Sequence, residues 1–121
     1  MRFLLSALLL LPLYSFAATV NYSCDYTSYS DQKGNHKAKD KFVLNFIVDT
    51  GSGKSYLLGN NGSAEIKSFI YEDRAIFIEV TATGNIISTA VDSNLNSVHS
   101  RNSVIIGELV PSQHYGKCTI K

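Results

Sequence analysis

The chain has 121 residues, of which 45% are hydrophobic, and its formal net charge is +1. This length is enough for one small domain. A nucleic-acid-binding protein normally has a basic excess or a basic stripe, and this sequence has neither, which argues against nucleic acid as a partner.

The first 17 residues have the layout of a cleavable secretory signal peptide. Met1-Arg2 is a short positive region, Phe3 to Leu13 is almost entirely apolar, and Ser15-Phe16-Ala17 provides small residues for signal peptidase. The apolar run is too short to anchor the chain in a bilayer. We therefore expect cleavage after Ala17, with Ala18 as the alternative. Residues 18–121 would form a single β domain in the periplasm, without membrane insertion.

Cys24 and Cys118 are the two cysteines of the sequence, and they lie near the two ends of the mature chain. In an oxidising compartment the simplest expectation is that they pair. The Cys-x-x-Cys spacing of many zinc sites is absent. The sequence thus predicts one disulfide, and two free buried thiols are the alternative.

Short segments of alternating apolar and polar residues, separated by turn residues, follow the signal peptide. Asn60-Asn61-Gly62 is the strongest hairpin signal, because Asn-Gly readily adopts positive φ angles. Pro111 is expected to end the last hairpin before a final strand returns toward the start of the chain. The predicted strands are Val20–Tyr26, Phe42–Val48, Ser55–Leu58, Ile66–Ile70, Ile76–Val80, Ile86–Val91, Ser97–Arg101, Val104–Val110 and Tyr115–Ile120.

This order of elements predicts an all-β domain of about eight antiparallel strands in a meander, without crossover helices. The meander would form either a small barrel or a two-sheet sandwich, and the sequence leaves both open. The polar stretch Thr27 to Lys41 is expected to be an exposed, mobile loop. This loop would be either a solvated connection or a contact for a partner.

Asp49-Thr50-Gly51, which follows an apolar run, resembles the catalytic motif of aspartic proteases. Val104-Ile105-Ile106-Gly107 resembles the apolar element behind the active loop of the retroviral-type enzymes. Such enzymes bring two aspartates together, one from each subunit. However, an ordinary Asp- and Gly-rich hairpin turn accounts for the same residues, and no glycine-rich flap is evident between the two motifs. We therefore predict a turn and a protein that is not an enzyme.

The three histidines, His36, His99 and His114, lack the short fixed spacing that is typical of metal ligands. His99 and His114 flank the same predicted hairpin and could meet at a copper or zinc site, whereas exposed histidines are the commoner outcome. We predict neither a bound metal nor a cofactor.

Residue types that are frequent at binding hot spots gather in the segment Tyr26 to His36 and near one end of the last hairpin. Alternatively, Tyr115 and Gly116 only form the turn that leads to Cys118. The predicted partner-binding residues are Tyr26, Tyr29, His36, His99, Arg101, Glu108, Gln113, His114 and Tyr115.

Four segments resemble small periplasmic β proteins of Gram-negative bacteria, most of which have no assigned activity. These segments are Gly59-Asn60-Asn61-Gly62, Phe77-Ile78-Glu79, Val98-His99-Ser100-Arg101 and Pro111-Ser112-Gln113-His114-Tyr115-Gly116-Lys117-Cys118. The resemblance covers nearly all of the mature chain and implies its fold and location more than its role. In size, export and β architecture the chain is also similar to periplasmic immunity proteins, which neutralise type VI secretion toxins that attack peptidoglycan.

The expected function is therefore a protein-binding inhibitor, most concretely an immunity protein against a secreted cell-wall hydrolase. A rigid scaffold closed by a disulfide loses little conformational freedom when it docks. Edge strands would allow two copies to pair as a homodimer. A lipocalin-like carrier of a small ligand and a dimeric aspartic protease using Asp49 are the alternatives.

Overall fold

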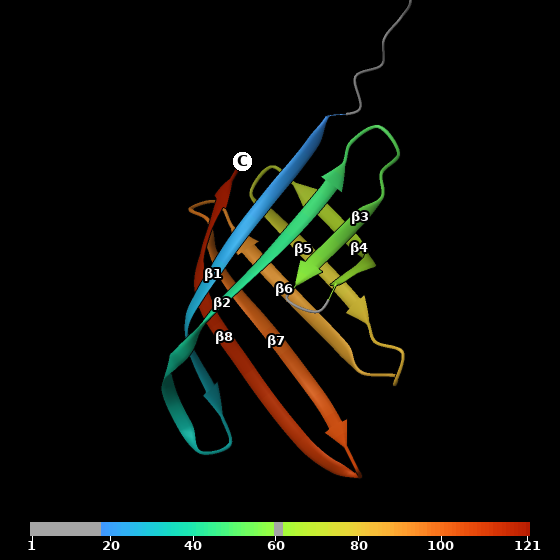
Figure 1. The fold of residues 1–121 in the computed structure, drawn as a ribbon. Helices are drawn as coiled ribbons and strands as arrows, with labels where there is room; N and C mark the ends of the chain where they lie inside the picture. The colour runs from blue at the N-terminus through green and yellow to red at the C-terminus, as the bar shows by residue number, and fades with distance from the viewer. Residues whose placement is uncertain (1–17, 60–61) are drawn as a thin grey trace, which may run out of the picture.

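The computed structural model describes residues 18–59 and 62–121, so the predicted signal peptide and the Asn60-Asn61 turn lie outside the described residues. The described residues form eight strands that pair antiparallel in chain order, and β8 pairs back with β1 to close a barrel (Figure 1). The predicted all-β meander is confirmed, and of the two predicted arrangements the structure has the barrel. The strands are β1 (Thr19–Asp31), β2 (Gly34–Asp49), β3 (Ser55–Gly59), β4 (Gly62–Tyr71), β5 (Arg74–Val80), β6 (Ile86–Asp92), β7 (Asn96–Ile105) and β8 (Glu108–Ile120).

Side chains from alternate positions of the strands fill the centre of the barrel. Phe46 and Phe77 are 1% and 2% exposed, and their rings stack with centroids 4.5 Å apart. Between these rings and His99 the remaining cavity measures about 10 Å³, which is room for about one water molecule. The space between these rings is therefore too small for the ligand of a lipocalin-like carrier.

The predicted disulfide between Cys24 and Cys118 is present in the structure. The two cysteines are direct partners in the register of β1 and β8, the two strands whose pairing closes the barrel. Both side chains belong to the buried core. The disulfide therefore fastens the closing pair of strands from the inside.

Each of the eight described strands pairs with a neighbour on both sides. No strand of this part of the chain leaves one side wholly unpaired, because barrel closure removes sheet edges. The expectation of whole edge strands is therefore corrected for the described residues, and the homodimer stays a prediction without that support. Within residues 18–59 and 62–121, no helix is long and apolar enough to cross a membrane.

The expected loop Thr27 to Lys41 is instead the outer part of the β1–β2 hairpin, with a tight turn at Gln32-Lys33. Ser28 and Tyr29 also pair with β8, opposite Tyr115 and His114. Residues 28–30 thus pair on both sides, with β2 and with β8, and residues 34–37 pair with β1, so strand pairing orders most of this polar segment although it lies beyond the apolar core. The prediction of a mobile loop is therefore corrected.

The β7–β8 hairpin turns at Ile106-Gly107, inside the segment predicted as the strand Val104 to Val110. Pro111 does not end the hairpin, because β8 continues through it to Ile120. At Pro111 the strand pairs only with β7, since the pairing of β8 with β1 ends at Gln113. A proline, which has no N–H, is tolerated at such a one-sided position.

Candidate functional site

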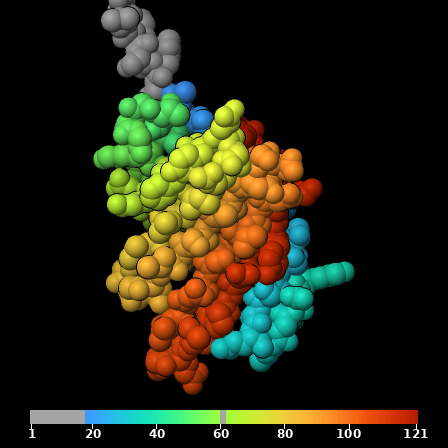
Figure 2. All heavy atoms as spheres, turned by 180° about the vertical axis from the view of Figure 1, so that it is seen from behind, coloured from blue at the N-terminus to red at the C-terminus, as the bar shows by residue number. Residues whose placement is uncertain are grey.

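Two neighbouring features lie at the barrel end where the β1–β2 and β7–β8 hairpins project. Figure 2 shows both projections at the lower end of the molecule, β1–β2 in cyan and β7–β8 in orange-red. One feature is a pocket at the open end of the barrel, here called the mouth pocket. The other is the end of the β7–β8 hairpin from Val104 to Val110, here called the hairpin tip.

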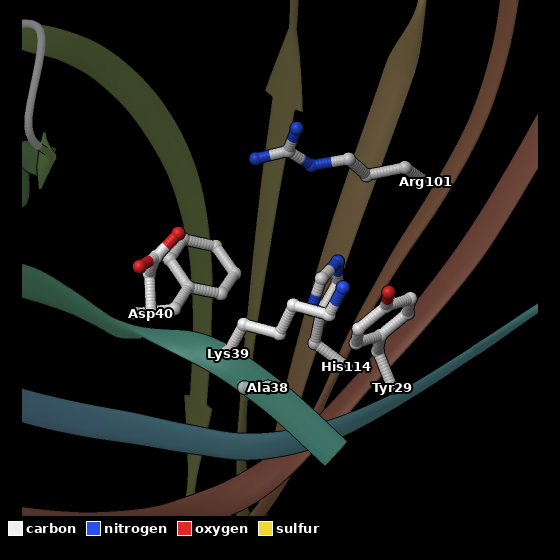
Figure 3. A pocket seen from close by; sticks show the side chains of 7 residues that line it. Tyr29, Ala38, Lys39, Asp40, Arg101 and His114 are labelled. Atoms are coloured by element: carbon white, nitrogen blue, oxygen red, sulfur yellow. The ribbon is translucent and has the colours of Figure 1, made fainter. Parts of the chain in front are cut away.

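An irregularity in the β1–β2 pairing builds the mouth pocket. Tyr26 pairs with Phe42 and Ser28 pairs with Lys37, so four residues of β2, 38–41, lie opposite Thr27 alone. Such bulges bend a strand and are frequent beside functional sites. The pocket has a volume of about 390 Å³ (Figure 3), within the usual range for small-ligand sites. It is lined by Tyr29, Ala38, Lys39, Asp40, Phe42, Arg101 and His114.

Aromatic and imidazole rings form one wall of the mouth pocket. Tyr29 lies between His36 and His114, at centroid distances of 4.9 and 5.4 Å. Phe42 meets His114 edge-on at 4.9 Å. Asp31 accepts a hydrogen bond from Nε2 of His36 at 2.9 Å, which holds the outermost ring. The wall is thus a continuous set of ring contacts from the rim inward.

Arg101 is held from beneath by a buried histidine. Nε of Arg101 donates to Nε2 of His99 at 3.3 Å. Because a guanidinium nitrogen can only donate, Nε2 carries no proton, and the proton on Nδ1 is donated to Oγ1 of Thr89 at 2.7 Å. His99 and Thr89 are 1% and 2% exposed. The pair therefore forms a neutral, fixed support for a charged side chain.

The buried state of His99 predicts a strong dependence of stability on pH. Burial, then the charges of Arg101 and His114, lower the pKa of His99 from 6.5 to about 3. At pH values between 6.5 and about 3, the imidazole of His99 therefore binds a proton in the unfolded chain but stays neutral in the folded chain. We expect the free energy of unfolding to fall by about 1.4 kcal/mol per pH unit once the pH is below the unfolded value.

Denaturant titrations at several pH values would measure this slope. His114, whose pKa is also lowered by burial and by Arg101, acts in the same direction. Asp31, Asp49 and Asp92 have lowered pKa values, so their contributions are lost only as the pH falls below their ordinary value of 3.8. The window between about pH 6.5 and 4.5 thus reports His99 and His114. A His99→Phe variant should show a flatter profile, and a flat wild-type profile would contradict the neutral buried His99.

The hairpin tip exposes apolar side chains that a folded protein normally covers. Ile106 is 97% exposed, and it occupies the two-residue turn with Gly107. The neighbouring apolar residues are also exposed, at 44–59%: Val104, Ile105, Leu109 and Val110. Two side-chain contacts fix the base of the tip, since Asn85 accepts from the N–H of Val104 and Gln32 donates to the carbonyl of Leu109.

Ile106 also has a backbone conformation that is unfavourable for its side chain. Its φ is 50°, and a β-branched residue in the left-handed region is a genuine outlier. Leu95 has a similar φ of 66°, but it packs against the core and its carbonyl accepts from the N–H of Cys118. The side chain of Ile106 has no such packing, so folding alone gives no reason for an isoleucine there.

The structure separates the predicted partner-binding residues into three groups. Tyr26 and His99 are each 1% exposed, so the prediction that they contact a partner directly is wrong. The hydroxyl of Tyr26 bonds Ser97 at 2.9 Å, and burial raises its pKa to about 12. Tyr29, Arg101 and His114 line the mouth pocket, and His36 contacts Tyr29. The exposed residues Glu108, Gln113 and Tyr115 lie along β8.

Sequence reasoning missed Lys39, Asp40 and Phe42 of the mouth pocket, and it missed Ile106. The first three lie in segments predicted as a loop and as a strand, and no local pattern marks a bulge. The signal for Ile106 was present, because Ile106-Gly107 places glycine where a two-residue turn needs positive φ.

The Asp49-Thr50-Gly51 motif forms the β2–β3 turn. Oδ1 of Asp49 accepts from the N–H groups of Gly51 and Ser52, and these bonds lower the pKa of Asp49. The motif lies at the opposite end of the barrel from Ile106-Gly107 (Figure 1). The two segments that resemble protease elements therefore do not pack together.

His99 and His114 do meet, as direct partners of β7 and β8 with ring centroids 6.0 Å apart. Both nitrogens of His99 are already engaged, by Thr89 and by Arg101. In the part of the chain that the structure describes, no group of three or more His, Cys, Asp or Glu side chains could hold a metal ion.

Comparisons with protein-family models, with curated proteins and with solved structures find no match to this chain.

Proposed function

We propose that this protein is a periplasmic protein-binding inhibitor, an immunity protein that neutralises a secreted peptidoglycan-degrading toxin of type VI secretion. The class of partner is proposed because the chain is similar to periplasmic immunity proteins in size, expected export and β architecture. The mode of binding follows from the hairpin tip, and the exposed, strained Ile106 is the observation that supports it most.

An exposed apolar cluster on a small protein marks a surface that binds something else. The hairpin tip is narrow and projects beyond the barrel (Figure 2), a shape suited to a cleft in a partner. Its base is held by Asn85 and Gln32. Such preorganisation reduces the conformational entropy that is lost on binding.

Strain at Ile106 supports a role in binding rather than in folding. Holding a non-glycine residue in a sparsely populated backbone region costs about 1 to 3 kcal/mol, and such residues cluster at functional sites. Asparagine at this position would suit a two-residue hairpin turn better. An isoleucine there therefore lowers the stability of the free protein while it provides apolar surface.

Ile106→Asn separates these two effects. We expect the variant to gain about 1 kcal/mol of unfolding free energy, because asparagine accepts a positive φ. We also expect at least a tenfold loss of inhibition, because an apolar anchor in a partner's pocket is removed. Denaturant titration measures the first effect. A peptidoglycan-lysis assay with the secreted hydrolases of the same cells measures the second.

Ile120→Asn is the matched control, since Ile120 is 53% exposed at the other end of β8. This variant should keep full inhibition. The proposal is overturned if the wild-type protein inhibits none of these hydrolases, or if Ile106→Asn inhibits as well as the wild type does.

A further inference from the structure

The guanidinium of Arg101 faces the mouth pocket, and among the described residues its two terminal nitrogens have no hydrogen-bond or salt-bridge partner. Arg101 lines both the mouth pocket and an adjoining pocket of about 330 Å³, which also contains Glu79. Within residues 18–59 and 62–121, Arg101 makes no salt bridge, and its one side-chain hydrogen bond uses Nε. Figure 3 shows the guanidinium extended away from its strand, toward the space that the pocket side chains border.

The surroundings of Arg101 fix its position before any ligand arrives. His99 accepts from Nε, and Thr89 holds the ring of His99. The guanidinium carbon lies 5.9 Å from the centroid of the Phe42 ring, within the range of a cation–π contact. The Arg101 side chain is thus held in place, and the four N–H donors of its two terminal nitrogens are left for a ligand. A planar guanidinium can donate two parallel hydrogen bonds to the two oxygens of a carboxylate.

The other charges at the mouth favour an anion of low charge. Lys39 and Asp40 are both exposed on the bulge and border the mouth pocket, and Glu79 borders the adjoining pocket. With Arg101 these make two positive and two negative groups. Such a balance suits a monoanion better than a dianionic phosphate, which the two carboxylates would repel. The ring wall of Tyr29, Phe42 and His114 adds an apolar surface for the body of the ligand.

We infer that the mouth pocket binds a carboxylate, with Arg101 as its anion-binding group and His99 as the residue that positions Arg101. The carboxylate lies against the terminal nitrogens of Arg101, and a ring or apolar chain attached to it lies against Tyr29, Phe42 and His114. This site is separate from the hairpin tip, so the inference does not rest on the proposed function.

Benzoate is a suitable probe, and benzamide is its neutral counterpart of the same shape. We expect saturable benzoate binding in NMR titrations that follow the Arg101 side-chain N–H signals, at least tenfold tighter than benzamide.

Arg101→Gln should weaken benzoate binding at least tenfold. Arg74→Gln is the matched control, because it removes the same charge from a surface residue that pairs with Asp73. That variant should bind benzoate as the wild type does. Ile106→Asn should also leave benzoate binding unchanged, which separates this test from that of the proposed function.

His99→Phe keeps a ring in the core but removes the acceptor for Nε of Arg101. We expect several-fold weaker benzoate binding and a shifted Arg101 Nε–H signal, which loss of packing elsewhere would not produce. If this variant does not fold, Arg101→Gln still decides the inference, because Arg101 is only half-buried.

A short peptide with one glutamate side chain distinguishes the two sources of a carboxylate. Tighter binding of benzoate indicates a small aromatic acid as the ligand, and tighter binding of the peptide indicates an acidic side chain of a protein. The inference is overturned if benzoate does not saturate, if benzamide or inorganic phosphate binds as tightly, or if Arg101→Gln changes nothing.

Discussion

Replacing Cys24 and Cys118 together by alanine should lower the free energy of unfolding by about 4.7 kcal/mol. The two cysteines are 94 residues apart in sequence, so their link removes much conformational freedom from the unfolded chain. Small domains have a total stability of about 5 to 15 kcal/mol. The double variant is therefore expected to be marginally folded, or unfolded at physiological temperature.

Urea titration of the oxidised wild type and of the double variant measures this difference. The wild type titrated with a reductant provides the control, because reduction of the unfolded chain should give a similar loss without any change of sequence. Both cysteines are buried at the closing pair of strands, so the variant also loses packing there. A loss below about 1 kcal/mol would contradict a stabilising role of this link.

Gly116→Ala should be among the most destabilising single substitutions, with an expected loss of about 3 to 5 kcal/mol. A Cβ at Gly116 would lie 2.0 Å from the carbonyl oxygen of Asp25 and 2.7 Å from Cα of Tyr26. These are backbone atoms of β1, next to the bulge where β1 and β8 change register. They cannot yield without separating the two strands that close the barrel.

Gly59→Ala is the matched control for this prediction. A Cβ at Gly59 would meet only Cδ2 of Leu44, at an ordinary contact distance of 3.7 Å. We expect its free energy of unfolding to change by less than about 1 kcal/mol. If Gly116→Ala proved as mild as Gly59→Ala in thermal and urea unfolding, the close approach of β1 and β8 would be wrong.

Strands inside the barrel could be predicted from the sequence with small errors. The predicted segments Ile76–Val80 and Ile86–Val91 correspond to β5 (Arg74–Val80) and β6 (Ile86–Asp92). In both strands one face is buried in the core and the other is exposed, which produces the alternating pattern. The alternation of apolar and polar residues in these two strands thus results from the burial of one face.

The same reasoning failed beyond the barrel, at the outer part of the β1–β2 hairpin. Residues such as Lys37 and Lys41 are exposed there, so burial leaves no alternating pattern in the sequence. Pairing of β1 with β8 and the contact of Tyr29 with His36 and His114 order this segment instead. These partners are distant in sequence, and no local pattern indicates them.

The candidate site was predictable in its residue types but not in its arrangement. Arg101, His114 and Tyr29 were identified from the frequency of such residues at binding sites, and all three line the mouth pocket. His99 was assigned to the same surface, whereas it lies beneath Arg101 in the core. Inward-facing residues of β7 lie either in the core, as His99 does, or at the rim, as Arg101 does. Which of the two applies depends on the position of the residue along the barrel axis, and this position cannot be read from the sequence.

The sequence by itself determined the all-β class, the antiparallel order and the pairing of Cys24 with Cys118. Local alternation and turn residues indicate the first two, and the presence of two cysteines in a chain with an expected secretory signal favours the third. Only the tertiary structure decided that β8 closes on β1, that residues 38–41 bulge to open a pocket, and that Ile106 ends a projecting hairpin. These features depend on the register between strands, and register is set by contacts across the whole barrel rather than by neighbours in the chain.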